Sequence, residues 1–199
     1  MSFRKEKKYR LSFSDLTSVK KQLFQTGMVS LHPTRLINSC YFDNSELKLF
    51  HESEEGVLPR KKFRIRWYNK SNIFTEEIKI SSIEGRFKYQ KKILNIHKTD
   101  ELFDITIFDK FYGELKPILI VSYEREYFKF NDLRITFDKN ISYTFIKTIS
   151  KPMLKDKECV MEVKVPIYCD DGYIENLIHI PTTRFSKYSR GCLLKNKQI

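Results

Sequence analysis

The sequence predicts a mainly β (α+β) fold, an antiparallel, tunnel-like β-barrel of about eight strands with a few flanking helices. Two features of the sequence lead to this prediction. Short segments rich in β-branched and aromatic residues recur along all 199 residues, which is typical of strands. Within several of these segments charged and apolar residues alternate, so the charges of one strand share a face.

Eight segments are predicted to be strands, and they occur from one end of the chain to the other. In chain order they are Lys7–Phe13, Leu36–Phe42, Lys61–Tyr68, Phe74–Ser81, Phe87–Ile93, Pro117–Tyr127, Leu133–Asp138 and Cys159–Val165. Three helical stretches interrupt them. The strands therefore dominate, and the helices are expected to flank the sheet.

Three stretches between the strands are predicted to be helical. The first follows Ser14 as its N-cap and ends at Gly27, as expected of a polar cap and a glycine stop. The second follows Ser45 and ends near Gly56. The third runs from about Thr99 towards Gly113, with Leu102, Ile105 and Phe108 on one stripe.

Composition indicates one soluble domain over residues 1–199. Apolar residues make up 41% and charged residues 31%, with six glycines and six prolines, which excludes collagen-like, low-complexity and disordered classes. No apolar run reaches the ~18 residues of a membrane span, and the charged N-terminus is unlike a secretory signal. The cysteines lack Cys-x-x-Cys spacing, so we expect reduced thiols and a cytoplasmic protein.

The alternation of charged residues can be followed strand by strand. In Phe63–Trp67 the two arginines share the face opposite the apolar residues, and in Met161–Val165 Glu162 and Lys164 do so. The same parity groups Glu77 with Lys79, Glu6 with Lys8, and Arg134 with Thr136 and Asp138. Arg125 departs from this pattern, because it shares the parity of Leu119, Val121 and Tyr123.

Two interpretations of the charged face remain open. An antiparallel sheet with one solvated face often carries charges of both signs. Alternatively, the charged face is turned inward, and a barrel of about eight strands then has room for one slender ligand. The surplus of 37 basic over 25 acidic residues, a net charge of +12, favours a polyanionic partner. Carboxylates among such cations would suit a divalent metal shared with phosphate oxygens.

An ordered series of motifs supports the second interpretation. They are Arg4-Lys5-Glu6-Lys7-Lys8-Tyr9, Cys40-Tyr41-Phe42-Asp43-Asn44, Arg60 to Tyr68, Glu77-Ile78-Lys79, Ser122-Tyr123-Glu124-Arg125, Arg134 to Asp138, Met161-Glu162-Val163-Lys164 and Phe185-Ser186-Lys187-Tyr188. With these motifs the chain resembles the polyphosphate polymerase domain of the vacuolar transporter chaperone family, a branch of the triphosphate tunnel metalloenzymes. The resemblance extends from about Arg4 to Gly191.

This resemblance implies an enzyme that transfers the terminal phosphoryl group of ATP, or of another nucleoside triphosphate, to a growing polyphosphate chain in a basic tunnel. The implied catalytic cations are Lys8, Arg64, Arg66, Lys79, Arg125, Arg134 and Lys187. Arg184 and Lys164 would bind substrate, and Glu162, with Glu6 as the weaker candidate, would bind Mn²⁺ or Mg²⁺. The expected partners are the nucleoside triphosphate and polyphosphate, and no specific nucleic acid is expected among them. No membrane span is expected in this chain.

Two other functions stay open. One is hydrolysis of inorganic triphosphate, a nucleoside triphosphate or an RNA 5′-triphosphate. Such enzymes usually carry a Glu-x-Glu-x-Lys strand, whereas this chain has Glu6-Lys7-Lys8. The other is a non-catalytic module that binds polyphosphate or nucleic acid, for which Glu162 would have no use. A P-loop and a kinase-type glycine loop are absent from the sequence, which excludes those modes of phosphate binding.

Overall fold

The computed structural model describes residues 4–69, 71, 73–146, 153–166 and 168–196. The strands are β1 (Arg4–Leu11), β2 (Val29–Asp43), β3 (Arg60–Tyr68), β4 (Phe74–Ser82), β5 (Gly85–Ile93), β6 (Ile107–Asp109), β7 (Gly113–Phe130), β8 (Leu133–Phe145), β9 (Leu154–Lys155) and β10 (Cys159–Pro166). The helices are α1 (Phe13–Gln25), α2 (Lys48–Glu55), the 3₁₀ helix η1 (Thr99–Asp104), α3 (Asp171–Leu177) and α4 (Lys187–Asn196).

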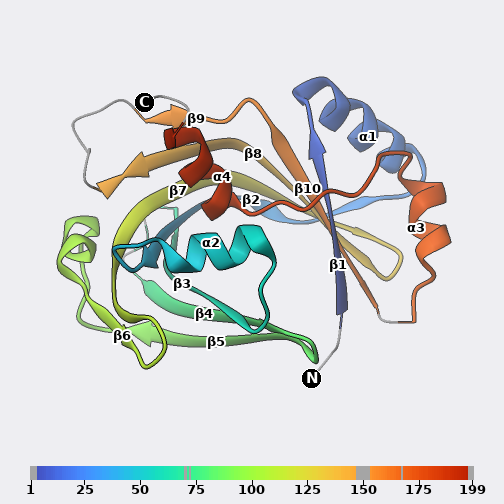
Figure 1. The fold of residues 1–199 in the computed structure, drawn as a ribbon. Coiled ribbons are helices and arrows are strands. Elements are labelled where there is room, and N and C mark those ends of the chain that lie inside the picture. Colours follow the sequence, from blue (N-terminus) through green and yellow to red (C-terminus); the bar gives the residue numbers. More distant parts are fainter. Residues whose placement is uncertain (1–3, 70, 72, 147–152, 167, 197–199) are drawn as a thin grey trace. The chain divides into compact units, whose positions relative to one another are not determined.

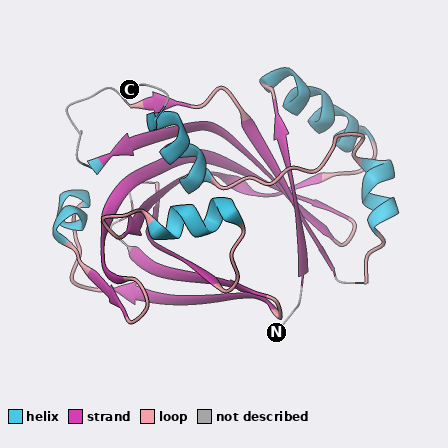
Figure 2. Ribbon diagram, in the orientation of Figure 1, coloured by secondary structure: helices cyan, strands magenta, loops and turns pink. Residues whose placement is uncertain are grey.

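The strands belong to one sheet in the order β1-β10-β8-β7-β2-β3-β4-β5, with β6 added beside β7 and β9 beside β8. The pairs β1–β10, β10–β8, β2–β3, β3–β4 and β4–β5 are all antiparallel. Strands dominate the molecule, as Figure 2 shows. The predicted mainly β class, with an antiparallel path of eight strands and a few helices, is confirmed.

The chain forms two compact units, each assembled from three segments. The first consists of Met1–Leu36, Tyr123–Ile141 and Lys155–Phe185, and the second of Ile37–Ser122, Ser142–Leu154 and Ser186–Ile199. The long strands β2, β7 and β8 each contribute residues to both units. Each unit has its own apolar core and its own group of charged side chains.

The core of the first unit lies on one face of β1, β10 and β8. Met161 and Val163 of β10 pack there with Tyr9 of β1 and Phe137 of β8. Helix α1 covers this face and contributes Leu16 and Leu23 to the same core, and α1 lies beside β1 and β10 in Figure 1. The parity prediction for these strands is therefore confirmed, because the apolar set is in the core and the charged set faces the other way.

The core of the second unit lies on one face of β2, β3 and β4. Phe63, Ile65 and Trp67 of β3 pack with Phe42 of β2 and Phe74 of β4. The opposite face of β3 carries Arg64 and Arg66, which are also buried, with 6% and 7% of their surface exposed. Both faces of β3 are thus covered, so its arginines do not lie on an ordinary solvated surface.

The start of the first helix differs from the prediction. Ser12, not Ser14, is the N-cap of α1, and its hydroxyl accepts a hydrogen bond from the Asp15 amide while the Asp15 carboxylate accepts one from the Ser12 amide. This reciprocal capping box satisfies two backbone donors that the first turn would otherwise leave unpaired. Phe13 consequently begins the helix instead of ending the first strand, and it is exposed.

The third predicted helix is wrong over most of its length. Only Thr99–Asp104 is helical, as the 3₁₀ turn η1, and residues 107–109 form β6 beside β7. Leu102 is buried, as the stripe requires, whereas Phe108 is 76% exposed. The spacing of three between these apolar residues fits a helix as well as a turn followed by a strand. Pairing of Ile107 with Leu115 on β7 decides in favour of the strand.

The second predicted helix is confirmed as α2, which ends at Gly56 in a left-handed conformation that favours glycine. Helices α3 and α4 were not predicted. The four cysteines, Cys40, Cys159, Cys169 and Cys192, are free thiols. None of the helices in the described ranges combines the length and the apolarity needed to cross a bilayer.

Candidate active site

The charged face of the first unit is built from three rows of residues across β1, β10 and β8. The strand register places Lys8 opposite Glu162 and Glu162 opposite Thr136. In the next row Glu6 lies opposite Lys164, which lies opposite Arg134. The third row on this face consists of Arg10, Val160 and Asp138. Directly opposed residues of an antiparallel pair share a face and have Cβ atoms about 5 Å apart. We call Glu6, Lys8, Arg125, Asp138, Glu162 and Lys164 the Glu162 cluster.

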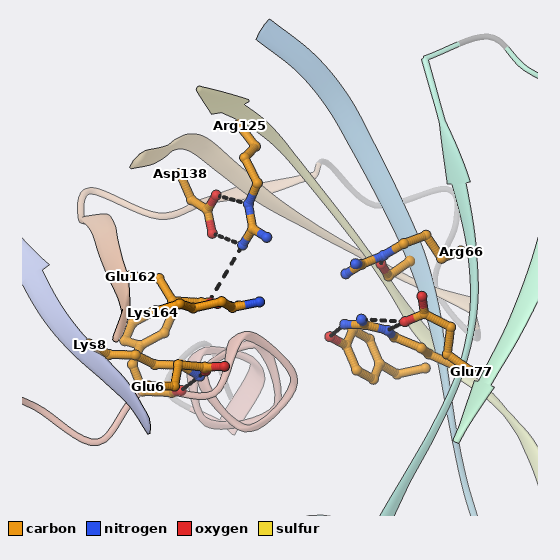
Figure 3. A network of polar contacts seen from close by, with 12 residues as sticks. Glu6, Lys8, Arg66, Glu77, Arg125, Asp138, Glu162 and Lys164 are labelled. Carbon is orange, nitrogen blue, oxygen red and sulfur yellow. Dashed lines mark hydrogen bonds and ion pairs between the residues drawn. The ribbon is translucent and has the colours of Figure 1, made fainter. Parts of the chain in front are cut away.

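The two candidate metal ligands of this cluster each contact cations (Figure 3). The Glu162 carboxylate lies 3.4 Å from Lys164 Nζ and 3.7 Å from Arg125 Nη2. The Glu6 carboxylate lies 3.3 Å from Lys8 Nζ. All three distances exceed the roughly 2.8 Å of a charge-assisted hydrogen bond. These three contacts are therefore mainly Coulombic.

Arg125 is held much more firmly than the other cations of the cluster. Its Nε and Nη2 donate to the two oxygens of Asp138 at 2.5 and 2.7 Å, a bidentate pair (Figure 3). Burial alone would lower the pKa of Arg125, but the charge of Asp138 outweighs it, so the pKa lies well above its ordinary value. Arg125 has the opposite parity to Phe128 and Phe130, which lie in the core of this unit, so the alternation of β7 places its guanidinium on the charged face with Asp138 and Glu162.

The other predicted cations of the first unit are more accessible. Arg134 is exposed at the edge of the three rows. Arg184 is also exposed, in the segment between α3 and α4. Its neighbours tie this segment to β1, because the Thr183 amide donates to the Lys8 carbonyl at 2.8 Å and Lys8 Nζ donates to the Phe185 carbonyl at 3.0 Å. The predicted phosphate-binding set of this unit therefore gathers around β1 and its neighbours.

The charged face of the second unit carries a second network. Arg64 Nε donates to Glu77 Oε2 at 2.7 Å and Arg64 Nη1 donates to the Tyr41 hydroxyl at 3.1 Å. The other oxygen of Glu77 accepts from Gln90 at 2.7 Å and lies 2.8 Å from Lys88 Nζ. Figure 3 shows Arg66 and Glu77 of this network. We call Ser39, Tyr41, Arg64, Arg66, Glu77, Lys88 and Gln90 the Arg64 cluster.

Electrostatics in this cluster favour the ionised forms of Glu77 and Tyr41, whereas burial lowers the pKa of Lys88. Burial would raise the pKa of Glu77, but the charges of Arg64 and Arg66 outweigh it and lower the pKa from 4.5 to about 2. Burial likewise opposes ionisation of Tyr41, yet the same two arginines and Lys187 lower its pKa below the ordinary value. The positive charge of the cluster thus exceeds what its one buried carboxylate neutralises, as expected of a site for anions.

The remaining predicted cations of the second unit lie around this network. Arg66 Nε donates to the Ser39 hydroxyl at 3.1 Å. Lys79 is exposed on β4, opposite Lys62 on one side and Lys88 on the other, so it shares their face. Lys187 is the first residue of α4, and its charge acts on Tyr41. The structure therefore brings Arg64 and Arg66 into one buried network, with Lys79 and Lys187 at its periphery.

The residues that anchor these arginines were not predicted as site residues. They are Asp138 for Arg125, and Glu77 and Tyr41 for Arg64. Asp138 and Glu77 share the parity of predicted cations in the sequence, which is the one signal that could have found them. Tyr41 carries no comparable signal, because its partner Arg64 is apparent only from the β2–β3 register.

The two candidate metal ligands form only a partial coordination set. Within the described part of the chain, no three His, Cys, Asp or Glu residues come close enough together to hold an ion by themselves. Mg²⁺ commonly binds through one or two carboxylates and completes its shell with water and phosphate oxygens. Glu162 and Glu6, on neighbouring strands and one row apart, fit such a shared site, and they would supply oxygen ligands only.

The fold is shared with several solved structures. A protein from Vibrio parahaemolyticus, named as an adenylate cyclase candidate, aligns with a TM-score of 0.55 at 16% identity over 93% of this chain and 95% of its own. A Bacillus halodurans protein named in the same way gives 0.57 at 14% identity over 93% and 94%. A Hippeastrum protein, named as an adenylyl cyclase candidate with dominant triphosphatase activity, gives 0.54 at 12% identity over 95% of each chain.

These structural similarities establish the common fold, and the family is determined by comparison of the sequence. No curated protein matches the chain closely enough to count as a relative. A family model does match, however, over residues 3–195, which is nearly the entire chain and includes every residue of both clusters. The match agrees with the resemblance that the ordered motifs indicated. The chain therefore belongs to the VTC domain family.

Proposed function

We propose that the chain catalyses metal-dependent phosphoryl transfer from ATP, or another nucleoside triphosphate, to a growing polyphosphate chain. Membership of the VTC domain family and the fold shared with a triphosphatase support the broader class, a triphosphate-tunnel enzyme. The transfer activity and the polyphosphate acceptor rest on the resemblance in the motifs together with the chemistry of the two clusters.

The observation that carries the proposal is the anchoring of an arginine by a carboxylate on the charged face of each unit. Arg125 is fixed by the two oxygens of Asp138, and Arg64 is fixed by Glu77. Phosphoryl transfer requires positioning and charge neutralisation more than covalent chemistry from the protein. Guanidinium groups that are already oriented on folding need little reorganisation when phosphate arrives.

The cations would have two roles that depend on their exposure to solvent. Exposed or half-exposed groups such as Arg134, Lys164 and Lys79 can reach a phosphate chain from solvent and bind it. The buried, anchored arginines would stabilise negative charge on the reacting phosphate groups. In the transfer, the bond from the γ-phosphorus to the bridging oxygen breaks, and a terminal oxygen of the acceptor chain bonds to that phosphorus. The nucleoside diphosphate leaves with the bonding electron pair.

Glu162 is the first candidate for holding Mn²⁺ or Mg²⁺, and Glu6 is the second. Both carboxylates lie next to cations, namely Lys164 and Arg125 beside Glu162 and Lys8 beside Glu6, so an ion held by them would lie close to a phosphate group bound by those cations. When bound, the ion would neutralise charge on the transferring phosphoryl group. The residues of this chain would orient the phosphates through the cations on either side of Glu162.

Hydrolysis is the second candidate function, and the Hippeastrum neighbour with its dominant triphosphatase activity favours it. The same clusters would then bind the triphosphate, with water as the acceptor in place of a phosphate chain. A module that only binds polyphosphate is the third. It would gain nothing from Glu162, because a carboxylate between two lysines and an arginine weakens the attraction for an anion.

One incubation separates the three functions. The pure protein is mixed with ATP and either Mn²⁺ or Mg²⁺, and the products are resolved by gel electrophoresis alongside a free-phosphate assay. Long polyphosphate chains with matching ADP are the expected result. Free phosphate without chains would show that the protein hydrolyses ATP and does not transfer its phosphoryl group. If neither product forms but polyphosphate binds tightly, the protein is a binding module.

A further inference from the structure

A buried hydroxyl on the charged face of the first unit is unsatisfied. Within the described residues, Thr136 Oγ1 has no hydrogen-bond partner although it is shielded from solvent. Buried polar side chains nearly always have one, so an exception needs an explanation. Thr136 lies on β8 directly opposite Glu162 of β10, and the hydroxyl nevertheless forms no bond to that carboxylate.

The surroundings of this hydroxyl indicate which partner it lacks. Arg134 and Asp138 precede and follow Thr136 by two residues and therefore share its face. Asp138 is already engaged by Arg125, whereas Arg134 is exposed and Lys164, opposite it, has a side chain that is 40% exposed. A phosphate group held by these two cations would bring acceptor oxygens to the row next to Thr136.

We infer that Thr136 donates a hydrogen bond to a phosphoryl oxygen of a bound oligophosphate. The inference rests on the proposed function for its class of ligand and adds a neutral, directional contact to the cations of the Glu162 cluster. A threonine hydroxyl has one donor and two acceptor sites, and a fully ionised phosphate offers acceptors only. The donor must therefore be the hydroxyl, and the phosphate replaces the partner that the folded chain does not provide.

This role has a consequence for stability that an ordinary structural threonine would not have. Thr136→Val keeps the branched shape and removes the unsatisfied group, so the ligand-free protein should become more stable. A rise in Tm of about 2–4 °C is expected for a chain of this size. The same substitution should weaken binding of inorganic tripolyphosphate about 10- to 100-fold, the usual effect of losing a hydrogen bond to a charged group.

The test measures tripolyphosphate binding by calorimetry, once with EDTA and once with Mn²⁺, and Tm without ligand. Thr136→Val is compared with wild type, with Thr136→Ser, and with Thr144→Val as a control on the same strand but outside the Glu162 cluster. We expect Thr136→Val to bind more weakly by the same factor in both conditions. Thr136→Ser should stay within about threefold of wild type, because it retains the donor, and Thr144→Val should bind as wild type does.

Each other outcome overturns the inference. Unchanged binding in Thr136→Val would remove the contact, and a loss seen with Mn²⁺ alone would make the hydroxyl a metal ligand instead of a phosphate donor. Weaker binding together with a lower Tm would make the hydroxyl structural. Failure of wild type to bind tripolyphosphate would refute the site, whereas binding without ATP turnover would refute only the proposed function.

Discussion

The hydroxyl of Tyr188 donates a 2.6 Å hydrogen bond to the Asp43 carboxylate and so ties α4 to the end of β2. Asp43 also accepts from the amides of Asn44, Leu49 and Phe50, the last two in α2. Helix α2 has no side-chain cap of its own, so this strand residue satisfies its first turn. Burial raises the pKa of Asp43, and these four donors offset part of that effect.

Replacing Tyr188 by Phe should destabilise the protein while keeping the ring that stacks on Tyr41, 5.2 Å between centroids. The variant leaves a buried carboxylate without one of its donors, and we expect a loss of about 1.5–3 kcal/mol in the free energy of unfolding. Urea titration followed by fluorescence measures it. Tyr173→Phe is the control, because Tyr173 is exposed and its hydroxyl accepts a hydrogen bond from Asn131 in an exposed pair, and its effect should stay below about 0.5 kcal/mol. Equal losses in both variants would contradict the anchoring role of Asp43.

Glu77→Gln should change how stability depends on pH. The pKa of Glu77 is lowered from 4.5 to about 2 in the folded state, so the folded state favours the ionised form. This contribution is fully present above the unfolded pKa of about 4.5, and it is lost as the pH falls from there towards 2. The shift corresponds to a contribution on the order of 3 kcal/mol.

Wild type should therefore exceed Glu77→Gln in unfolding free energy by about that amount at pH 7. The difference should shrink steadily in urea titrations at pH 4, 3 and 2. Glu124→Gln serves as the comparison, because Glu124 has a 41% exposed side chain and its ion pair with Lys139 spans 3.9 Å. Its difference from wild type should be small at every pH. A difference for Glu77→Gln that does not change with pH would show that the charge of Glu77 is not what matters.

Arg134→Ala should impair triphosphate binding without impairing folding. Arg134 is exposed, so the variant loses little packing, whereas one hydrogen bond to a charged phosphate corresponds to roughly a 10- to 100-fold change in affinity. Arg134→Lys should restore part of the loss, since an ammonium group cannot make the bidentate contact. Affinity for tripolyphosphate and Tm are the two measurements. Wild-type affinity in Arg134→Ala would remove this residue from the site.

Much of this fold was predictable because strand parity is a strict rule. The alternation in β3 and β10 correctly separated core residues from charged residues within each unit, since a strand offers only two faces. The helices were less predictable for a physical reason. The stripe Leu102, Ile105, Phe108 is compatible with a helix until β7 supplies a pairing partner, and that information is not local. Helix α4 depends likewise on a distant partner, Asp43.

The cations of the site could be predicted from the sequence, whereas the residues that anchor them could be predicted less well. Basic residues that alternate with apolar residues are easily recognised in a sequence, and the ordered motifs indicated which of them belong to the site. Their anchors depend on which strands become neighbours. Arg125 and Asp138 are 13 residues apart on β7 and β8, and Tyr41 and Arg64 are 23 apart on β2 and β3. Strand parity places Thr136 on the charged face with Arg134 and Asp138, but only the three-dimensional structure shows that its hydroxyl is unsatisfied within the described residues.

Glu162→Gln separates an enzyme from a binding module. The substitution keeps the shape of a side chain that is 10% exposed and removes one negative charge near Arg125 and Lys164. Polyphosphate binding without metal should be as tight as in wild type or tighter, because a repulsive charge has gone. Turnover of ATP with Mn²⁺ should fall by orders of magnitude, since a metal ion stabilises the charge of the transition state by several kcal/mol. Both are measured on one preparation, with Glu124→Gln expected to match wild type in each. If turnover is retained, Glu162 is a structural residue. If the variant loses both polyphosphate binding and its folded state, Glu162 stabilises the sheet.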